Sequence, residues 1–119
     1  MDRMGYLHHG NYAAYFEAAR TELLREHGLS YKDVEEKGVI LPLRNLHVDF
    51  IQPVFYDEII TIETILEKVE GIRLFFKYII TNNKGDKISE ASTMLVFANA
   101  KTGKPIKMPE FFKEKLSTH

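Results

Sequence analysis

The sequence predicts an α+β domain in which one long helix packs on an antiparallel sheet. Three features support this prediction: a single apolar stripe of helical period near the N-terminus, four strand-like runs after it, and short connections between those runs. The chain has 119 residues and shows no repeat or linker, which fits the size of one ordinary domain. We therefore assign residues 1–119 to a single domain.

Residues 11–27 are expected to form the main helix. One face of this helix carries apolar side chains at helical spacing, namely Tyr12, Tyr15, Phe16, Ala19 and Leu23. On the helix surface we expect two charge pairs, Glu17 with Arg20 and Glu22 with Arg25. Gly28 follows the last turn, where a left-handed residue commonly ends a helix. A short second helix is expected over residues 31–37.

The rest of the chain reads as strands joined by tight turns. The four strand-like runs cover residues 39–51, 58–69, 72–81 and 87–100. Gly71 and the segment 82–86 are typical of hairpin turns, because glycine and asparagine accept positive φ. These connections predict an antiparallel meander with one face on the long helix, and a last short helix near Pro109.

The opposite face of the third strand also carries apolar side chains. Phe75 and Ile79 lie there between charged residues, and the second strand adds Ile59 and Ile65. Isolated apolar residues are common on protein surfaces. We interpret this set as a subunit interface.

Composition excludes several classes of function. Without cysteine the chain can have no disulfide, thiol nucleophile or thiolate metal site. The 16 basic and 17 acidic residues give a net charge of −1, so no nucleic-acid or anionic membrane partner is expected. No apolar run approaches the roughly 20 residues of a membrane span, and the first residues lack a signal-peptide core, which predicts a cytoplasmic protein. Metal-ligand spacings and glycine-rich phosphate loops are also missing, so we expect no metal and no cofactor.

The densest group of polar and aromatic residues lies immediately before the long helix. It consists of Asp2, Tyr6, His8, His9, Asn11 and Tyr12. A helix N-terminus offers unpaired backbone N–H groups that can stabilise an oxyanion, and a nearby carboxylate can act as nucleophile or base. Spacing alone leaves open that these residues form a solvated loop.

This opening segment resembles the signature of hotdog-fold acyl-CoA thioesterases. The resemblance rests on Asp2-Arg3-Met4-Gly5-Tyr6-Leu7-His8-His9-Gly10-Asn11-Tyr12, followed by Tyr15-Phe16-Glu17-Ala18-Ala19-Arg20 and Glu22-Leu23-Leu24. It continues through Tyr31, Gln52-Pro53-Val54, Asp57, Gly103-Lys104-Pro105 and Pro109. The branch it resembles contains 4-hydroxybenzoyl-CoA thioesterase and the YbgC-like thioesterases. The resemblance implies a hotdog fold, a long central helix wrapped by an antiparallel β-sheet.

The resemblance also implies roles for individual residues. Asp2 matches the catalytic carboxylate, which attacks the thioester carbonyl or activates water to do so. His9 matches the position whose backbone N–H polarises that carbonyl, and its side chain could assist proton transfer. Gly5 would allow the turn that brings Asp2 back to the helix end, while Asn11 and Tyr12 would position the substrate.

For assembly, the resemblance implies a homodimer or homotetramer with active sites at the subunit interface, where two sheets join edge to edge. The phosphates of acyl-CoA would lie near Lys or Arg, with Arg73, Lys101 and Lys104 as candidates. Family members usually have a strand before the catalytic aspartate, and only Met1 precedes Asp2 here. Either the native start lies upstream of Met1, or this chain lacks the family's first strand, and we expect four strands in the sheet formed by the sequence given.

Two other functions remain open. One is a hotdog-fold hydratase or dehydratase acting on an acyl thioester. The other is a non-catalytic acyl-CoA-binding subunit of the same fold.

Overall fold

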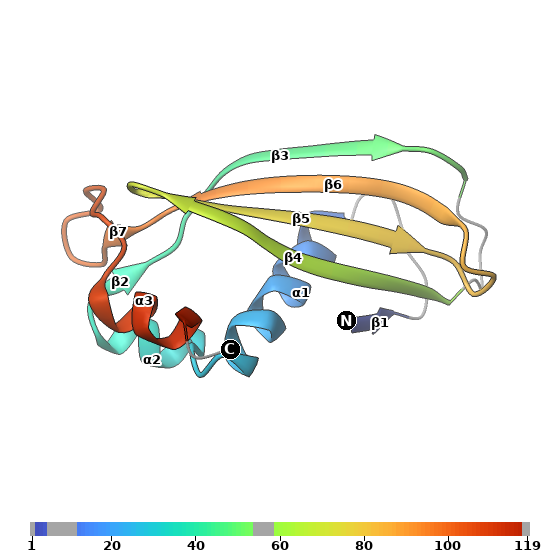
Figure 1. Cartoon of the computed structure of the whole chain (residues 1–119). Helices are drawn as coiled ribbons and strands as arrows, with labels where there is room; N and C mark the ends of the chain where they lie inside the picture. The colour runs from blue at the N-terminus through green and yellow to red at the C-terminus, as the bar shows by residue number, and fades with distance from the viewer. Residues whose placement is uncertain (1, 5–11, 54–58, 118–119) are drawn as a thin grey trace.

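The computed structural model describes residues 2–4, 12–53 and 59–117. In chain order its elements are β1 (Asp2–Met4), α1 (Tyr12–Glu26), α2 (Tyr31–Glu36), β2 (Val39–Ile40), β3 (Leu43–Phe50), β4 (Ile60–Glu70), β5 (Arg73–Thr81), β6 (Lys87–Val96), β7 (Ala98–Asn99) and α3 (Glu110–Ser117). The long sheet curves over α1, while α2 and α3 lie together at one end of the molecule (Figure 1). The predicted α+β class, with one long helix against an antiparallel sheet, is confirmed.

The main sheet has the strand order β1-β4-β5-β6-β3, and every neighbouring pair is antiparallel. Strands β4, β5 and β6 form the predicted meander. A meander of four strands would also place the first long predicted strand, which contains β3, next to β4. This is wrong, because β3 pairs with β6 on the other side of the meander. The connection over residues 51–59 is much longer than the hairpin turns 71–72 and 82–86, so the chain can cross from one side of the sheet to the other.

The sheet also contains one strand more than the predicted four. Asp2–Met4 form β1, which pairs with the start of β4 so that Asp2 lies opposite Ile62. A strand of three residues is too short to show a period-two pattern. The prediction therefore counted Asp2 as part of a loop, whereas its backbone is held in the sheet.

Two of the predicted strands are divided in the structure. The run 39–51 splits at Pro42 into β2 and β3, since proline has no N–H to donate to a ladder. Its carbonyl instead accepts a hydrogen bond of 3.1 Å from the backbone N–H of Val96. The run 87–100 splits at Phe97 into β6 and β7, and β7 pairs with β2 in a second, two-stranded sheet.

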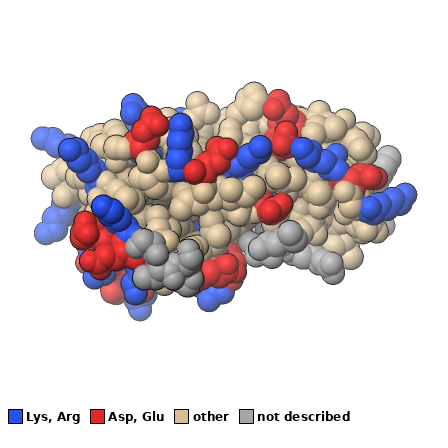
Figure 2. Space-filling model, in the orientation of Figure 1, with Lys and Arg blue, Asp and Glu red and all other residues tan. Residues whose placement is uncertain are grey.

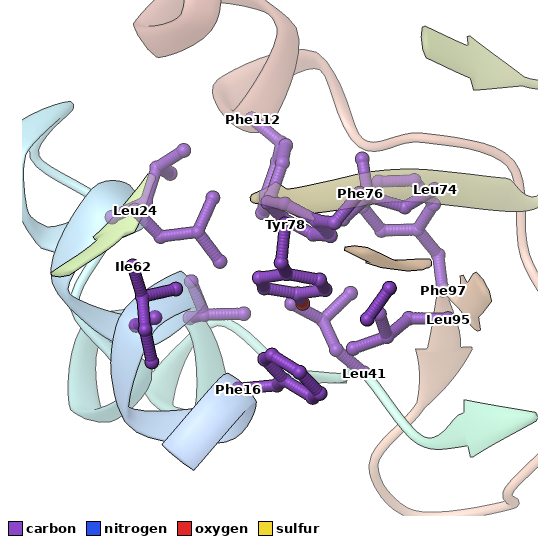
Figure 3. Close-up of a cluster of buried hydrophobic side chains, with 14 of the residues drawn as sticks. Phe16, Leu24, Leu41, Ile62, Leu74, Phe76, Tyr78, Leu95, Phe97 and Phe112 are labelled. Atoms are coloured by element: carbon purple, nitrogen blue, oxygen red, sulfur yellow. The ribbon is translucent and has the colours of Figure 1, made fainter. Parts of the chain in front are cut away.

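The core lies between α1 and the concave face of the sheet (Figure 3). Strand β5 alternates strictly, and its inward side chains, Leu74, Phe76, Tyr78 and Ile80, are fully buried. From α1 the buried apolar residues are Phe16, Ala19 and Leu24, while the predicted Tyr15 and Leu23 are half-buried. The rings of Phe16 and Tyr78 lie 4.5 Å apart between their centroids, which joins the helix to the centre of the sheet.

Candidate functional site

The described residues of the predicted site belong to β1 and to the start of α1. Strand β4 contacts both β1 and α1, so the two elements that carry the ends of the predicted motif share one neighbour. The structure places the backbone of Asp2 in β1 and makes Tyr12 the first residue of α1. Gly5, His9 and Asn11 lie outside the described residues.

A buried polar group joins α1 to this part of the sheet. Nη1 of Arg20 donates a hydrogen bond of 3.4 Å to Oη of Tyr78, and this oxygen lies 2.9 Å from Oγ1 of Thr93. All three residues are at most 4% exposed. Because arginine has only donors, Tyr78 accepts from Arg20 and its own hydrogen is free to donate to Thr93.

The prediction that Arg20 forms a surface pair with Glu17 is wrong. Arg20 comes one turn after Phe16 and beside Ala19, so it belongs to the buried face of α1. That position in the apolar stripe was the signal that could have revealed it. The second predicted pair is confirmed, since Arg25 and Glu22 form an ion pair on the exposed side of the helix.

Burial controls the acidity of the phenol in this group. Removal from water raises the pKa of Tyr78, and the hydrogen bonds to Thr93 and Arg20 oppose this shift only in part. The phenol therefore stays protonated at neutral pH and keeps its hydrogen within the core.

The largest exposed apolar side chains gather along β3 and the segment that follows it. Leu43, Leu46, Phe50 and Ile51 are 36–57% exposed, and Ile59 at the start of β4 is 44% exposed. By contrast, Phe75, Ile79 and Ile65 on the outer face of the sheet are half-buried, and Nζ of Lys68 lies 4.9 Å from the ring centroid of Phe75. The most exposed large apolar side chains thus lie on and next to β3, and the interface predicted on the outer face stays a prediction.

The candidate cations for phosphate binding lie at the other end of the sheet from Asp2. Asp2 pairs with Ile62, whereas Arg73 pairs with Glu70, eight residues further along β4 and so roughly 25 Å away. Lys101 and Lys104 lie in the turn after β7, at the same end as the β4–β5 hairpin (Figure 1). Lysine and arginine side chains extend from this end of the molecule (Figure 2). The structure therefore does not bring these three residues together with Asp2 of the same chain.

Two hollows in the described surface lie beside α2, away from β1. A groove of about 530 Å³ runs between α2 and α3, and an apolar hollow of about 280 Å³ lies between α2 and β2. Across the described ranges, no group of three or more His, Asp or Glu side chains could hold a metal ion. None of the described helices is long and apolar enough to cross a membrane.

Comparison with known proteins gives the family. A family model described as the thioesterase-like superfamily matches residues 1–116, almost the entire chain. The chain belongs to the thioesterase-like superfamily. The resemblance found in the opening motif is thereby confirmed, and the sheet that curves over α1 is the hotdog fold of these enzymes.

Named relatives of this thioesterase-like chain support the same branch. The acyl-CoA thioesterase YbgC of Helicobacter pylori strain J99 is 30% identical over 124 residues, covering 98% of this chain and 91% of the relative. The acyl-CoA thioester hydrolase YbgC of Escherichia coli O6:H1 is 29% identical over 109 residues, covering 92% and 81%. A solved structure, the DHNA-CoA thioesterase of Staphylococcus aureus, is 37% identical with a TM-score of 0.84 and covers 99% of this chain and 81% of that one.

Proposed function

We propose that this chain hydrolyses an acyl-CoA thioester to a free acid and CoA. The observation that carries the proposal is the pairing of β1 with β4, which fixes the backbone of Asp2 in the sheet beside the strand that also contacts α1. Such an arrangement suits a carboxylate that must act at the N-terminus of a helix. The names of the YbgC relatives agree with this reaction.

In the proposed mechanism the helix N-terminus and Asp2 act on the same carbonyl. The backbone N–H of His9 polarises the thioester oxygen, where negative charge develops in the transition state. Asp2 then either attacks the carbonyl carbon, giving an anhydride that water hydrolyses, or removes a proton from the water that attacks. In both routes the C–S bond breaks, the thiolate of CoA takes up a proton, and the acid leaves. Asn11 and Tyr12 would position the acyl group, and Gly5 would permit the turn between β1 and α1.

The proposed active form is a homodimer, or a tetramer built from two such dimers. Strand β3 is the last strand on its side of the described sheet, and its other edge carries no strand among the described residues. Edge strands of this length with exposed apolar side chains pair readily with another strand. We place the dimer contact at β3, where Leu46 and Phe50 pair with Thr93 and Ser89 of β6 and are 36% and 57% exposed.

The test is the release of free thiol from a panel of short, long and aromatic acyl-CoA esters. We expect the wild-type chain to hydrolyse at least one of them, and Asp2→Asn and Asp2→Ala to lower kcat by about 100-fold or more with the fold intact. Asp86→Asn is the matched control, because Asp86 lies in the exposed β5–β6 turn. An Asp2→Ala protein as active as the wild type would refute the proposed role of Asp2.

Measurements of hydration and of binding with the same kinds of ester separate the two other functions. Hydration of crotonyl-CoA without thiol release would indicate a hydratase. Binding of the esters with neither reaction would indicate a non-catalytic subunit.

A further inference from the structure

Burial of Arg20, Tyr78 and Thr93 costs free energy, and apolar packing alone does not explain why this polar group lies in the core. Arg20 is 4% exposed, yet its Nε has no hydrogen-bond partner among the described residues, and no described carboxylate forms an ion pair with it. A buried cation with incomplete partners is unfavourable compared with an apolar side chain of similar size. Buried polar groups of this kind are often associated with a defined arrangement of the elements they join.

The elements joined here are the two that carry the proposed catalytic groups. Arg20 lies eight residues after Tyr12, so it is about 12 Å along α1 from the helix start. Tyr78 lies on β5, two residues from Ile80, and Ile80 pairs with Ile62, which in turn pairs with Asp2. A short path through the sheet therefore connects Asp2 to Tyr78, which accepts the hydrogen bond from Arg20 of α1.

Directional hydrogen bonds define the axial position of a helix more narrowly than apolar contacts do. The ring of Phe16 lies against the ring of Tyr78 at 4.5 Å, and such ring contacts tolerate small displacements. The hydrogen bond from Arg20 to Tyr78 and the contact from Tyr78 to Thr93 are directional, so they define one axial position of α1.

We propose that Arg20, Tyr78 and Thr93 are positioning residues that set the distance between the N-terminus of α1 and Asp2. This inference rests on the proposed function, because it assigns these residues to the placement of the oxyanion-stabilising N–H relative to the carboxylate. Small misplacements of reacting groups lower the rate of the chemical step much more than they weaken substrate binding.

The experiment compares two single variants, their double variant and one control variant at a temperature well below their measured unfolding midpoints. Tyr78→Phe keeps the ring against Phe16 and removes only the hydroxyl. Thr93→Val removes the threonine hydroxyl that contacts the hydroxyl of Tyr78. Thr64→Val is the matched control, since Oγ1 of Thr64 is buried on β4 without a partner among the described residues. Circular dichroism establishes that each variant is folded under the assay conditions.

We expect Tyr78→Phe to lower kcat by roughly tenfold or more with KM within about twofold of the wild type. Thr93→Val should change kcat in the same direction, and the double variant should be no slower than Tyr78→Phe, because both remove one shared unit. Thr64→Val should keep the wild-type kcat. If Tyr78→Phe does not fold, Thr93→Val decides the outcome.

Three results would overturn the inference. The first is a wild-type kcat in folded Tyr78→Phe and Thr93→Val, even with a lower unfolding midpoint, which would mean that the group only stabilises the core. The second is an equal loss of kcat in Thr64→Val. The third is a wild-type chain that releases no thiol from any ester, which refutes the proposed function and this inference with it.

Discussion

At the scale of single residues, Tyr78 is a titratable side chain that lies in the core of the fold. Its ring is fully buried between Phe16 and Phe76, while its hydroxyl contacts Arg20 and Thr93. Burial raises the pKa of this phenol because the phenolate would lose its hydration. Folding stability must therefore depend on pH in the range where tyrosines ionise.

The direction of this dependence follows from the proton balance. Above a pH of about 10 the exposed tyrosine of the unfolded chain loses its proton, whereas Tyr78 in the folded chain keeps it. The folded state then binds more protons, so the free energy of unfolding falls as pH rises until Tyr78 itself ionises. Urea unfolding between pH 8 and pH 11 should show that the free energy of unfolding falls more steeply with pH for the wild type than for Tyr78→Phe. Parallel curves would contradict the raised pKa.

Residue types and periodicity predicted most of the core but not its polar part. The stripe on α1 correctly identified Phe16 and Ala19 as buried, and the alternation of β5 correctly assigned its inward face. Arg20 was predicted to lie at the surface because charged residues seldom lie in a core unless paired. Its partner Tyr78 is 58 residues away in the chain, so no local pattern could have shown the contact.

At the scale of elements, α2 depends on a single capping side chain. Ser30 has an extended backbone, and its hydroxyl accepts a hydrogen bond of 3.2 Å from the backbone N–H of Asp33. The helix has only six residues, so this bond is a large part of its local stability, and α2 buries Val34 against the core.

Ser30→Ala should lower the free energy of unfolding by about 1 kcal/mol, because the N–H of Asp33 loses its acceptor. Ser30→Asp is the control, since aspartate caps helices as well as serine and its charge suits a helix N-terminus. Chemical unfolding of the three proteins measures the difference. Equal losses in both variants would show that the serine is needed for a reason other than capping.

The number and pairing of strands show where prediction from the sequence ends. The strand-like runs predicted β4, β5 and all of β6, and the period of two was clearest in β5, where it is visible over nine residues. The same criterion could not detect β1, which has three residues and contains Asp2. The neighbour of β3 also could not be predicted, since its alternation is compatible with either side of the meander. The candidate site was thus found by its motif, and the strand that holds Asp2 came only from the structure.

At the scale of the whole molecule, the sheet is covered unequally. Helix α1 packs beneath the central strands, while β3 extends beyond it (Figure 1). Leu46 and Phe50 of β3 are 36% and 57% exposed. An exposed edge strand of eight residues would favour aggregation in a monomer unless a partner covers it. A second copy paired along β3 would cover the exposed β3 edge of each chain.

Phe50→Asp should therefore separate the proposed oligomer into monomers, because a carboxylate buried at the interface would lose its hydration without a partner. Phe50 is 57% exposed in the single chain, so the substitution should leave the monomer folded. Analytical ultracentrifugation measures the mass, with Ser92→Asp as the control, since it adds the same charge at an exposed position of β6 away from the edge. Thiol release should also fall in the Phe50→Asp protein, because the resemblance implies active sites at the subunit interface. An unchanged mass would place the interface elsewhere, and full activity in a monomer would show that one chain forms a complete site.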